Sequence, residues 1–447
     1  MDMESGRELA IKILNRIQNE GAYSTLAVKK ALEDKSERKD SGFVRELVYG
    51  VLENQRLIDE IVKESSSVKI RRIHPIILII LRTAIYQLLF MDTVPESAIV
   101  NEAVNLAKKY GHRGTTGFVN ALLRGVSSKK DYFKSEGYMS QESELGIRYS
   151  HPDYLVDLWR IQYGLEFTKD LLKANNSVPP FTIRNNSLKI DTTDLISILE
   201  AEGYETEPGK YSKDCVIIKN PRSMTRLSAY NDGLFTIQDE ASMLVTEVLN
   251  PQKYSLILDV CSAPGGKSTH IAQWIGDKGT IIARDIYPHK LKLIEELSLR
   301  LGIKSIKSEI WDATEPDDKL KYKVDYCLVD APCSGLGLIR RKPDIKWTRT
   351  SEELIELSRL QTSILKTASS YIKPGGILVY STCTINRQEN LDVVTNFLRE
   401  NTDFRLLPIE LANGVKISAT QNSGYLELYP NIHGTDGFFM AKMVREG

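Results

Sequence analysis

The stretch Leu256-Ile257-Leu258-Asp259-Val260-Cys261-Ser262-Ala263-Pro264-Gly265-Gly266-Lys267-Ser268 decides the fold of the C-terminal half of this chain. An apolar run over 256–260 leads into a glycine-rich turn, and a helix is predicted over 267–275. A strand that ends in such a turn lets the backbone approach a nucleotide closely at a helix N-terminus. The stretch therefore predicts a nucleotide-type site at the end of a core strand.

The same alternation of strands and helices continues to the end of the chain. Helices are predicted over 288–300 and 351–371, and the apolar runs that predict further strands lie at 280–283, 305–310, 324–329, 377–380 and 437–444. Strands that alternate with helices predict a mostly parallel, doubly wound α/β sheet. We assign residues 233–447 to this domain.

Two further domains are predicted before the sheet. Residues 1–130 are predicted to be helical, because apolar residues recur at helical spacing, and a polar segment near 128–145 is predicted to be a linker. Residues 146–232 combine predicted helices with short strands, which indicates a small helical and α+β unit. The most apolar stretch, Ile73 to Phe90, is interrupted by polar residues, so we expect a buried helix rather than a membrane span.

Composition limits the classes of function. The chain has 447 residues with Lys+Arg 59 and Asp+Glu 59, so net charge favours neither nucleic acid nor membrane, and a polyanion site would need local clustering. The first ten residues lack the apolar core of a signal peptide. The chain has 5 cysteines, and none of them shows C-x2-C spacing. This pattern indicates a reducing compartment and argues against disulfides or a metal site. We expect a cytoplasmic protein.

Three ligands compete for the glycine-rich turn. The dinucleotide fingerprint G-x-G-x-x-G is absent, whereas Gly266-Lys267-Ser268 matches the end of a P-loop whose first glycine position holds Cys261. Because Asp330 also follows a strand, as an NTPase aspartate would, an NTPase stays open. The third ligand is S-adenosylmethionine, with Asp285 placed for its ribose hydroxyls and Asp312 for its adenine amino group. Either aspartate could alternatively be a cap or turn residue.

Two cysteines follow neighbouring predicted strands. Asp330-Ala331-Pro332-Cys333 and Ser381-Thr382-Cys383 should emerge at the carboxyl edge of the sheet, where ligands bind in open α/β folds. Methylation of carbon 5 of a pyrimidine needs a thiolate at carbon 6, an acidic group at the ring edge and a base that removes the carbon 5 proton. Asp330, Cys333 and Cys383 supply these groups, although either thiol alone could simply pack in the core.

These motifs resemble those of the RNA cytosine-5 methyltransferases. Asp-Ala-Pro-Cys-Ser-Gly at 330–335 and Tyr-Ser-Thr-Cys-Thr at 380–384 are similar to the two cysteine motifs of that family, and 261–267 is similar to its cofactor loop. Thr-Ile-Gln-Asp-Glu-Ala-Ser at 236–242 and Asp-Gly-Phe-Phe at 436–439 are similar to its first and last motifs. Nearly the whole chain takes part in the resemblance.

The N-terminal domain indicates the branch of the family. Leu81-Arg82-Thr83-Ala84, Val94-Pro95, Asn101-Glu102-Ala103-Val104 and Phe118-Val119-Asn120 are similar to the helical RNA-binding domain of the antitermination factor NusB. The chain thus resembles the bacterial ribosomal small-subunit methyltransferase B group. The resemblance implies a class I S-adenosylmethionine-dependent methyltransferase fold, 146–232 as an RNA-binding linker domain, and a monomer that acts on small-subunit ribosomal RNA. A tRNA cytosine-5 methyltransferase and a non-catalytic RNA-binding factor remain alternatives.

The resemblance also implies residue roles. Cys383 would be the nucleophile and Cys333 the base, or its relay, in release, although DNA cytosine-5 enzymes attack with the cysteine of a Pro-Cys motif. Asp330 would hold the cytosine edge. The residues implied for S-adenosylmethionine binding are Cys261, Ser262, Ala263, Pro264, Gly265, Gly266, Lys267, Asp285, Asp312 and Asp330.

Two clusters of basic residues are candidates for contacts with RNA phosphates. The first runs from Lys108 to Lys134, and the second comprises Arg340, Arg341, Lys342 and Lys346. A solvated helix end or loop is the alternative for each.

Overall fold

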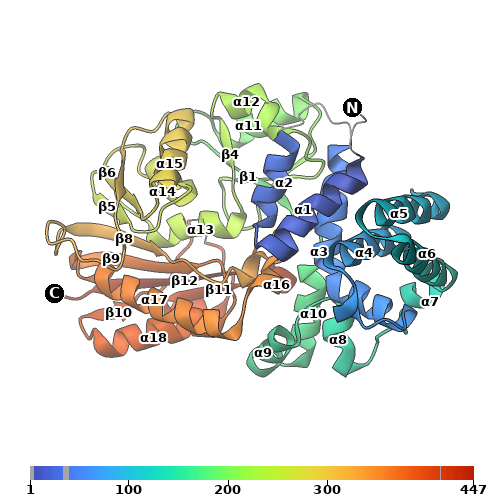
Figure 1. The fold of residues 1–447 in the computed structure, drawn as a ribbon. Helices are drawn as coiled ribbons and strands as arrows, with labels where there is room; N and C mark the ends of the chain where they lie inside the picture. Colours follow the sequence, from blue (N-terminus) through green and yellow to red (C-terminus); the bar gives the residue numbers. More distant parts are fainter. Residues whose placement is uncertain (1–4, 34–39, 413) are drawn as a thin grey trace. The chain divides into compact units, whose positions relative to one another are not determined.

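The computed structural model describes residues 5–33, 40–412 and 414–447, so the first four residues of the predicted helical domain lie outside it. The chain separates into two compact units. The first comprises Met1–Ser177 and Ile339–Thr348, and the second comprises Val178–Leu338 and Arg349–Gly447. Figure 1 traces the elements of both units along the sequence.

The first unit is helical, as the sequence predicts. Its apolar side chains form one buried cluster around α3 (Ser41–Ser65) and α4 (Pro75–Phe90), which confirms the buried helix predicted for the apolar stretch. Among the described residues, no helix is long and apolar enough to cross a bilayer. The other elements of the first 177 residues are α1 (Gly6–Glu20), α2 (Ser24–Glu33), η1 (Ile70–Arg72), α5 (Glu96–Tyr110), α6 (Arg113–Ser128), α7 (Lys130–Lys134), η2 (Glu142–Glu144), α8 (Leu145–Arg148), α9 (Asp153–Tyr163) and α10 (Leu165–Asn175).

The segment near 128–145 was predicted to be a linker, and this prediction is wrong. It forms α7 and η2, and two of its aromatic residues, Phe133 and Tyr138, are buried in the core of the helical unit, edge to face with ring centroids 5.2 Å apart. Burial of two rings outweighs the polar composition of the surrounding residues, because each large side chain contributes about 1.5–3 kcal/mol.

Residues 339–348 belong to the helical unit although they lie far along the sequence. Trp347, on the short helix α16 (Ile345–Thr348), donates its Nε1 hydrogen to the carbonyl oxygen of Leu52 at 2.7 Å. Asp344 accepts a hydrogen bond from the Ser24 hydroxyl at 2.6 Å. The segment is thereby hydrogen-bonded to both α2 and α3.

This packing corrects the second basic cluster. Lys346 is fully buried and donates from Nζ to the Glu53 carbonyl oxygen at 2.8 Å and to Asn176 Oδ1 at 3.0 Å. Arg340 is 6% exposed, whereas Arg341 is half-buried and Lys342 is exposed. The prediction of a solvent-facing cluster is therefore wrong for Lys346 and Arg340, because the helical unit covers them.

The second unit contains two sheets, with the topology that the sequence predicts for the larger one. The smaller sheet is antiparallel in the order β2-β3-β1-β4, and the larger follows β10-β12-β9-β8-β5-β6-β7, with β11 paired to β12. The strands are β1 (Phe181–Asn185), β2 (Thr206–Pro208), β3 (Cys215–Ile218), β4 (Phe235–Ile237), β5 (Leu256–Asp259), β6 (Thr280–Asp285), β7 (Ile306–Ile310), β8 (Val324–Asp330), β9 (Ile372–Thr382), β10 (Phe404–Leu406), β11 (Tyr425–Leu428) and β12 (Phe438–Arg445).

The helices of this unit include α11 (Thr192–Ala201) and α12 (Ser228–Asn231) beside the smaller sheet. The remaining elements are η3 (Met224–Arg226), α13 (Glu240–Leu249), α14 (Gly266–Trp274), α15 (Pro288–Leu301), η4 (Leu336–Leu338), α17 (Ser351–Ser369), η5 (Arg387–Glu389), α18 (Leu391–Glu400), η6 (Ala419–Ser423) and α19 (Pro430–His433).

The larger sheet is covered on both faces. Along β8, Cys327 and Val329 belong to a core with α17 and α18, whereas Leu328 between them belongs to a core with α13 and α14. Strand side chains alternate between faces, so both faces are buried at 327–329 and the strand is apolar there. Figure 1 shows α14 and α15 on one side of β5, β6 and β8, with α17 and α18 on the other. The doubly wound prediction is confirmed.

Strand β9 differs from its prediction at its start. Lys373-Pro374-Gly375-Gly376, which precedes the predicted strand 377–380, lies within β9. The pairing of β8 with β9 shifts register between Val324 and Tyr326, and Gly375 has φ +77, so the glycines form an irregularity in the strand.

The buried Lys346 makes stability depend on pH. Burial lowers its pKa to about 7, against the attraction of Glu53. Between that value and the ordinary pKa of about 10.4, the unfolded chain holds the proton more tightly than the folded chain, so folding stability rises with pH. We expect the melting temperature of the wild type to rise relative to that of Lys346→Met between pH 8 and pH 10. A series of thermal shift measurements at increasing pH checks this difference. Parallel curves for the two proteins would contradict this assignment.

Candidate active site

The carboxyl ends of β8 and β9 bring the two cysteine loops together. Asp330 lies opposite Ser381 in the parallel register, and the Ala331 amide donates to the Ser381 carbonyl oxygen at 2.9 Å. Pro332 follows, and a residue without an N–H cannot extend the ladder. The chain therefore leaves the sheet at the same level in both strands, and Cys333 Sγ lies 3.2 Å from Cys383 Sγ.

A buried carboxylate joins the two cysteine loops. Glu389 is fully buried and accepts hydrogen bonds from the Ser334 amide at 2.8 Å and the Ser334 hydroxyl at 2.6 Å. It also accepts from Gln361 Nε2 and Asn386 Nδ2, both at 3.0 Å. Ser334 follows Cys333 directly and hydrogen-bonds Thr384, which follows Cys383, at 2.8 Å. Glu389 thus fixes both loops, and no motif in the sequence had pointed to it.

Close backbone contacts require a glycine at position 337, just after the first cysteine loop. The Gly337 amide donates to the Cys383 carbonyl oxygen at 3.1 Å, and the Gly437 amide donates to the Gly337 carbonyl oxygen at 2.9 Å. A Cβ at Gly337 would lie 2.0 Å from the Gly437 oxygen. Three chain segments can meet behind Cys383 only because Gly337 has no side chain.

Lys267 supplies positive charge beside the thiols. Its Nζ lies 2.6 Å from Asp330 Oδ2 and 5.1 Å from the centre of the Phe438 ring, while Asp330 Oδ1 accepts a hydrogen bond from the Ser381 hydroxyl at 2.8 Å. Burial alone would lower the pKa of Lys267, but attraction to Asp330, with a smaller contribution from Cys383, raises it. Lys267 is therefore a permanent cation that favours a thiolate at Cys383.

Cys333 holds its proton more tightly than an ordinary cysteine does. The pKa of Cys333 is raised well above its usual value, first by its hydrogen bond to Cys383 and then by burial. Burial likewise raises the pKa of Cys261 and Cys327, which keeps these thiols protonated and unreactive. Cys333 thus holds a proton next to Cys383.

A cavity of about 410 Å³ opens beside the cysteines. This volume is within the range of roughly 300–1,000 Å³ typical of small-molecule sites. Its apolar walls include Ile286, Trp311, Pro332, Leu360 and Ile364. The predicted site residues that line it are Cys261, Ala263, Asp285, Asp312, Asp330, Cys333 and Cys383. The cavity lies where the strand order reverses between β5 and β8, which is the usual ligand position in doubly wound sheets.

The two predicted carboxylates after β6 and β7 also organise local turns. Asp285 accepts a hydrogen bond from the Tyr287 amide at 3.1 Å, and Asp312 accepts from the Thr314 amide at 2.9 Å and its hydroxyl at 2.7 Å. The turn role and the cavity role are therefore compatible, because one carboxylate oxygen is sufficient for each turn.

The remaining predicted residues of the loop lie outside the cavity lining. Ser262, Pro264, Gly265, Gly266 and Lys267 do not line it, although Lys267 reaches it through Asp330. Gly265 has φ +100, and its Cβ would lie 3.2 Å from Ile294 Cα, so the turn needs glycine. Ser268 is buried and donates to Asp259, whose pKa burial raises to about 7. In a P-loop the corresponding lysine and serine would face phosphate and metal, whereas here they face the carboxylates of Asp330 and Asp259.

Comparison with known proteins shows the family to which the chain belongs. Family models match three successive parts: the NusB family at residues 4–128, a ferredoxin-like domain of RsmF/B-like methyltransferases at 151–225, and the 16S rRNA methyltransferase RsmB/F at 246–444. The probable ribosomal RNA small subunit methyltransferase B of Bacillus subtilis (strain 168) is 36% identical over 451 residues, covering 100% of both chains. The chain belongs to the ribosomal RNA small subunit methyltransferase B family. It is therefore a transferase with a NusB-type N-terminal domain.

Other relatives support the same family. The ribosomal RNA small subunit methyltransferase B of Serratia proteamaculans (strain 568) is 31% identical over 444 residues, covering 98% of each chain. A crystal structure described as PH0851 superposes with a TM-score of 0.82 at 27% identity over 98% of both chains. The structure of NSun6 from Pyrococcus horikoshii with SFG superposes with a TM-score of 0.59 at 25% identity, over 66% of this chain and 98% of that one.

Removing the charge of Glu389 should disturb both cysteine loops. Every group around the carboxylate is a donor, so the amide hydrogens of Glu389→Gln would face donors and at least one buried group would lose its partner. We expect a loss of about 1–3 kcal/mol of stability, with slower methyl transfer. The change in Tm and the rate are compared with Glu353→Gln, a half-buried capping residue on α17. Equal effects of the two substitutions would contradict the role of Glu389.

Proposed function

We propose that this methyltransferase transfers a methyl group to carbon 5 of one cytosine in 16S ribosomal RNA through a covalent adduct with Cys383. The observation that carries this proposal is the 3.2 Å separation of Cys333 and Cys383 at the mouth of a nucleotide-sized cavity, with Lys267 and Asp330 beside them. One thiolate and one thiol at this separation suit addition to a ring followed by proton removal.

S-adenosylmethionine fits the cavity as the methyl donor. The carboxylates of Asp285 and Asp312 project from the ends of successive strands toward a site with apolar walls, which suits ribose hydroxyls and a purine ring. When bound, this cofactor supplies a methyl group on a sulfonium. The SFG in the NSun6 structure is an analogue of S-adenosylmethionine.

Cys383 is the proposed nucleophile. Its sulfur forms a bond to carbon 6 of the cytosine, and the electron pair of the C5–C6 double bond then lets carbon 5 accept the methyl group. Asp330, held by Lys267 and Ser381, accepts a hydrogen bond at the ring edge. Lys267 stabilises the attacking thiolate before the bond forms.

Cys333 is the proposed base for release. Its high pKa comes first from its hydrogen bond to Cys383, and that contribution disappears when the Cys383 sulfur becomes a thioether. Cys333 can then release its proton to solvent water and, as a thiolate, remove the proton on carbon 5. The C5–C6 double bond forms again, the bond from carbon 6 to sulfur breaks, and Cys383 leaves as a thiolate.

The role of each thiol predicts opposite crosslinking behaviour. Cys333→Ala should accumulate a protein–RNA adduct that survives denaturing electrophoresis, because attack proceeds and release does not. Cys383→Ala should give no adduct and no methyl transfer to unmodified 16S rRNA. An adduct with Cys383→Ala but not with Cys333→Ala would invert the assignment.

We further propose that a groove on the helical unit contacts the RNA backbone. This basic groove, of about 270 Å³, lies between η1 with the start of α4 and the start of α6, and it is lined by Val68, Arg72, Ile73, His74, Ile77, His112, Gly114, Thr115 and Phe118. Exposed Lys69 and Arg71 adjoin one side, and exposed Lys108 and Arg113 adjoin the other. No acidic residue occurs in 65–91 or 103–130.

The fold separates this groove from the rest of the first basic cluster. Lys109 pairs with Glu8 at 2.6 Å, Lys130 with Glu96 at 3.3 Å and Lys134 with Asp92 at 3.2 Å. Neutralised cations contribute little to phosphate binding, whereas unpaired exposed cations release counterions. The basic groove is therefore a better candidate for the RNA contact than the 124–134 end of the cluster. A ribosomal substrate also favours the expected cytoplasmic location.

Charge reversal separates the two parts of the cluster. Arg71→Glu with Arg72→Glu should weaken binding of unmodified 16S rRNA at least about tenfold and lower the salt dependence by about one unit per lost phosphate contact. Lys130→Glu with Lys134→Glu is the matched control, because both lysines already face carboxylates. Filter binding at several salt concentrations measures both quantities. A larger loss in the control pair would place the contact at the other end.

A further inference from the structure

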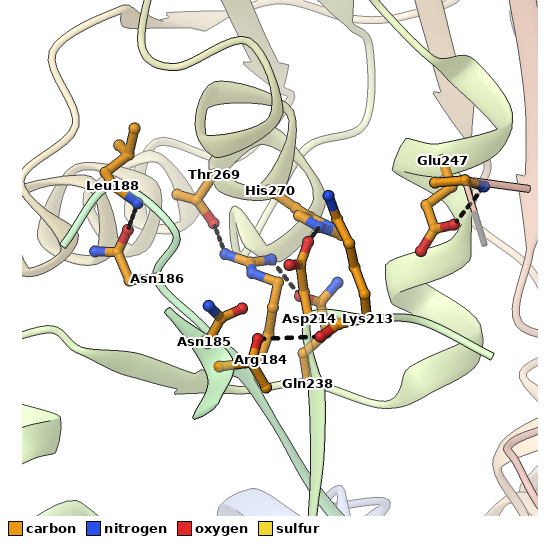
Figure 2. Close-up of polar contacts among 12 residues, drawn as sticks. Arg184, Asn185, Asn186, Leu188, Lys213, Asp214, Gln238, Glu247, Thr269 and His270 are labelled. Atoms are coloured by element: carbon orange, nitrogen blue, oxygen red, sulfur yellow. Dashed lines mark hydrogen bonds and ion pairs between the residues drawn. The ribbon is translucent and has the colours of Figure 1, made fainter. Parts of the chain in front are cut away.

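A buried arginine of the smaller sheet reaches the helix that follows the glycine-rich turn. Arg184, near the end of β1, is fully buried and extends its guanidinium toward α14, as Figure 2 shows. Nη1 donates to the Gly266 carbonyl oxygen at 2.6 Å, and Nη2 donates to the Thr269 hydroxyl at 3.0 Å. Nη1 also donates to the Gln238 side-chain oxygen. Arg184 therefore joins α14 to the segment that precedes α13.

The same helix has a second polar contact with this region. Asp214, just before β3, lies 3.3 Å from the adjacent α14 residue His270 (Asp214 Oδ2 to Nε2). Burial lowers the pKa of His270 to about 4, so the imidazole is neutral at physiological pH. Burial lowers the pKa of Arg184 to about 9 against the attraction of Asp214, so its guanidinium stays charged. Arg184 and Asp214 are thus two buried groups of opposite charge, and both contact α14.

The position of these contacts links them to the active site. Gly266 lies between the αL turn residue Gly265 and Lys267, whose ammonium holds Asp330 at 2.6 Å. Thr269 in turn donates to the Gly265 carbonyl oxygen at 2.8 Å, so Arg184 contacts the turn both directly and through Thr269. A displacement of the first turn of α14 would move both the 261–265 loop and Lys267.

We propose that Arg184 is a positioning residue for the cofactor: the ferredoxin-like domain uses its guanidinium to hold the loop 261–267 and the start of α14 in the binding geometry. This inference rests on the proposed S-adenosylmethionine site. Arginine is required because its planar fork donates to three acceptors in fixed directions, whereas a lysine ammonium is a compact charge on a flexible stem. The smaller sheet is then part of the cofactor site, in addition to any role in binding RNA.

The full-length Arg184→Lys variant tests the proposal with S-adenosylhomocysteine as the probe. Isothermal titration should show affinity about tenfold or more below that of the wild type, as expected when a supporting hydrogen-bond shell is lost. In methyl transfer to unmodified 16S rRNA, KM for S-adenosylmethionine should rise by the same factor, while kcat at saturation stays within about twofold. A general loss of folding would instead lower kcat and the amount of active protein.

Arg300→Lys is the matched control. Arg300 lies on α15 and donates to the Tyr230 and Phe235 carbonyl oxygens at 2.7 and 2.9 Å and to the Thr236 hydroxyl at 3.2 Å. Among the described residues, these hydrogen bonds hold the same domain and none of them reaches α14. Arg300→Lys should lower Tm and leave the affinity for S-adenosylhomocysteine within about threefold of the wild type. Such a change is smaller than the free energy of one hydrogen bond. If Arg184→Lys does not fold, Thr269→Val and Gln238→Leu each remove one acceptor and should weaken binding in the same direction.

The outcomes are distinguishable. Wild-type affinity for S-adenosylhomocysteine in every soluble variant among Arg184→Lys, Thr269→Val and Gln238→Leu would overturn the positioning role. An equal loss of affinity in Arg300→Lys and Arg184→Lys would also overturn it, because the effect would then be one of domain stability. A wild-type protein that does not bind S-adenosylhomocysteine would contradict the proposed function itself.

Discussion

The parallel pairing of β8 with β9 is the constraint on which the site depends. Asp330 opposite Ser381 places the two strand ends at one level, and each cysteine follows its strand within three residues. A change of register by one residue would turn alternate side chains to the opposite face and break both helix-covered cores. The apolar packing on the two faces of the sheet therefore also fixes the distance between the thiols.

Buried charges complete the geometry that the strands begin. Glu389 ties together the loops after β8 and β9, Lys267 connects the glycine-rich turn to Asp330, and Arg184 connects that turn to the smaller sheet. A buried charge is costly unless several partners satisfy it, so each of these groups restricts the conformations of the segments it joins. The proposed difference between Cys383 and Cys333 follows from this arrangement, because the cation and the hydrogen bond favour charge on one sulfur and a proton on the other.

The sequence predicts the parts of this structure that depend on local pattern. The strand from Val324 and the helix from Ser351 follow from runs of apolar residues, and the two strand-end cysteines indicated a shared site. Contacts between distant segments could not be predicted in this way. Lys346 looked like a surface cation because nothing local shows that residues 339–348 pack into the helical unit. The sequence does not reveal the acidic partners of Lys109 and Lys134. Glu8 is distant in sequence, and Asp92 lies outside the basic run. Glu389 and Arg184 lie outside the motifs that suggested the chemistry.

The central claim is that this chain methylates carbon 5 of a cytosine in 16S rRNA with Cys383 as the nucleophile. Bisulfite sequencing of 16S rRNA from cells with and without the gene tests it most directly. The account predicts one cytosine that resists conversion in the parent strain, loses resistance on deletion, and regains it with the wild-type gene but not with Cys383→Ala. An identical conversion pattern in parent and deletion strains, or restoration by Cys383→Ala, would contradict it.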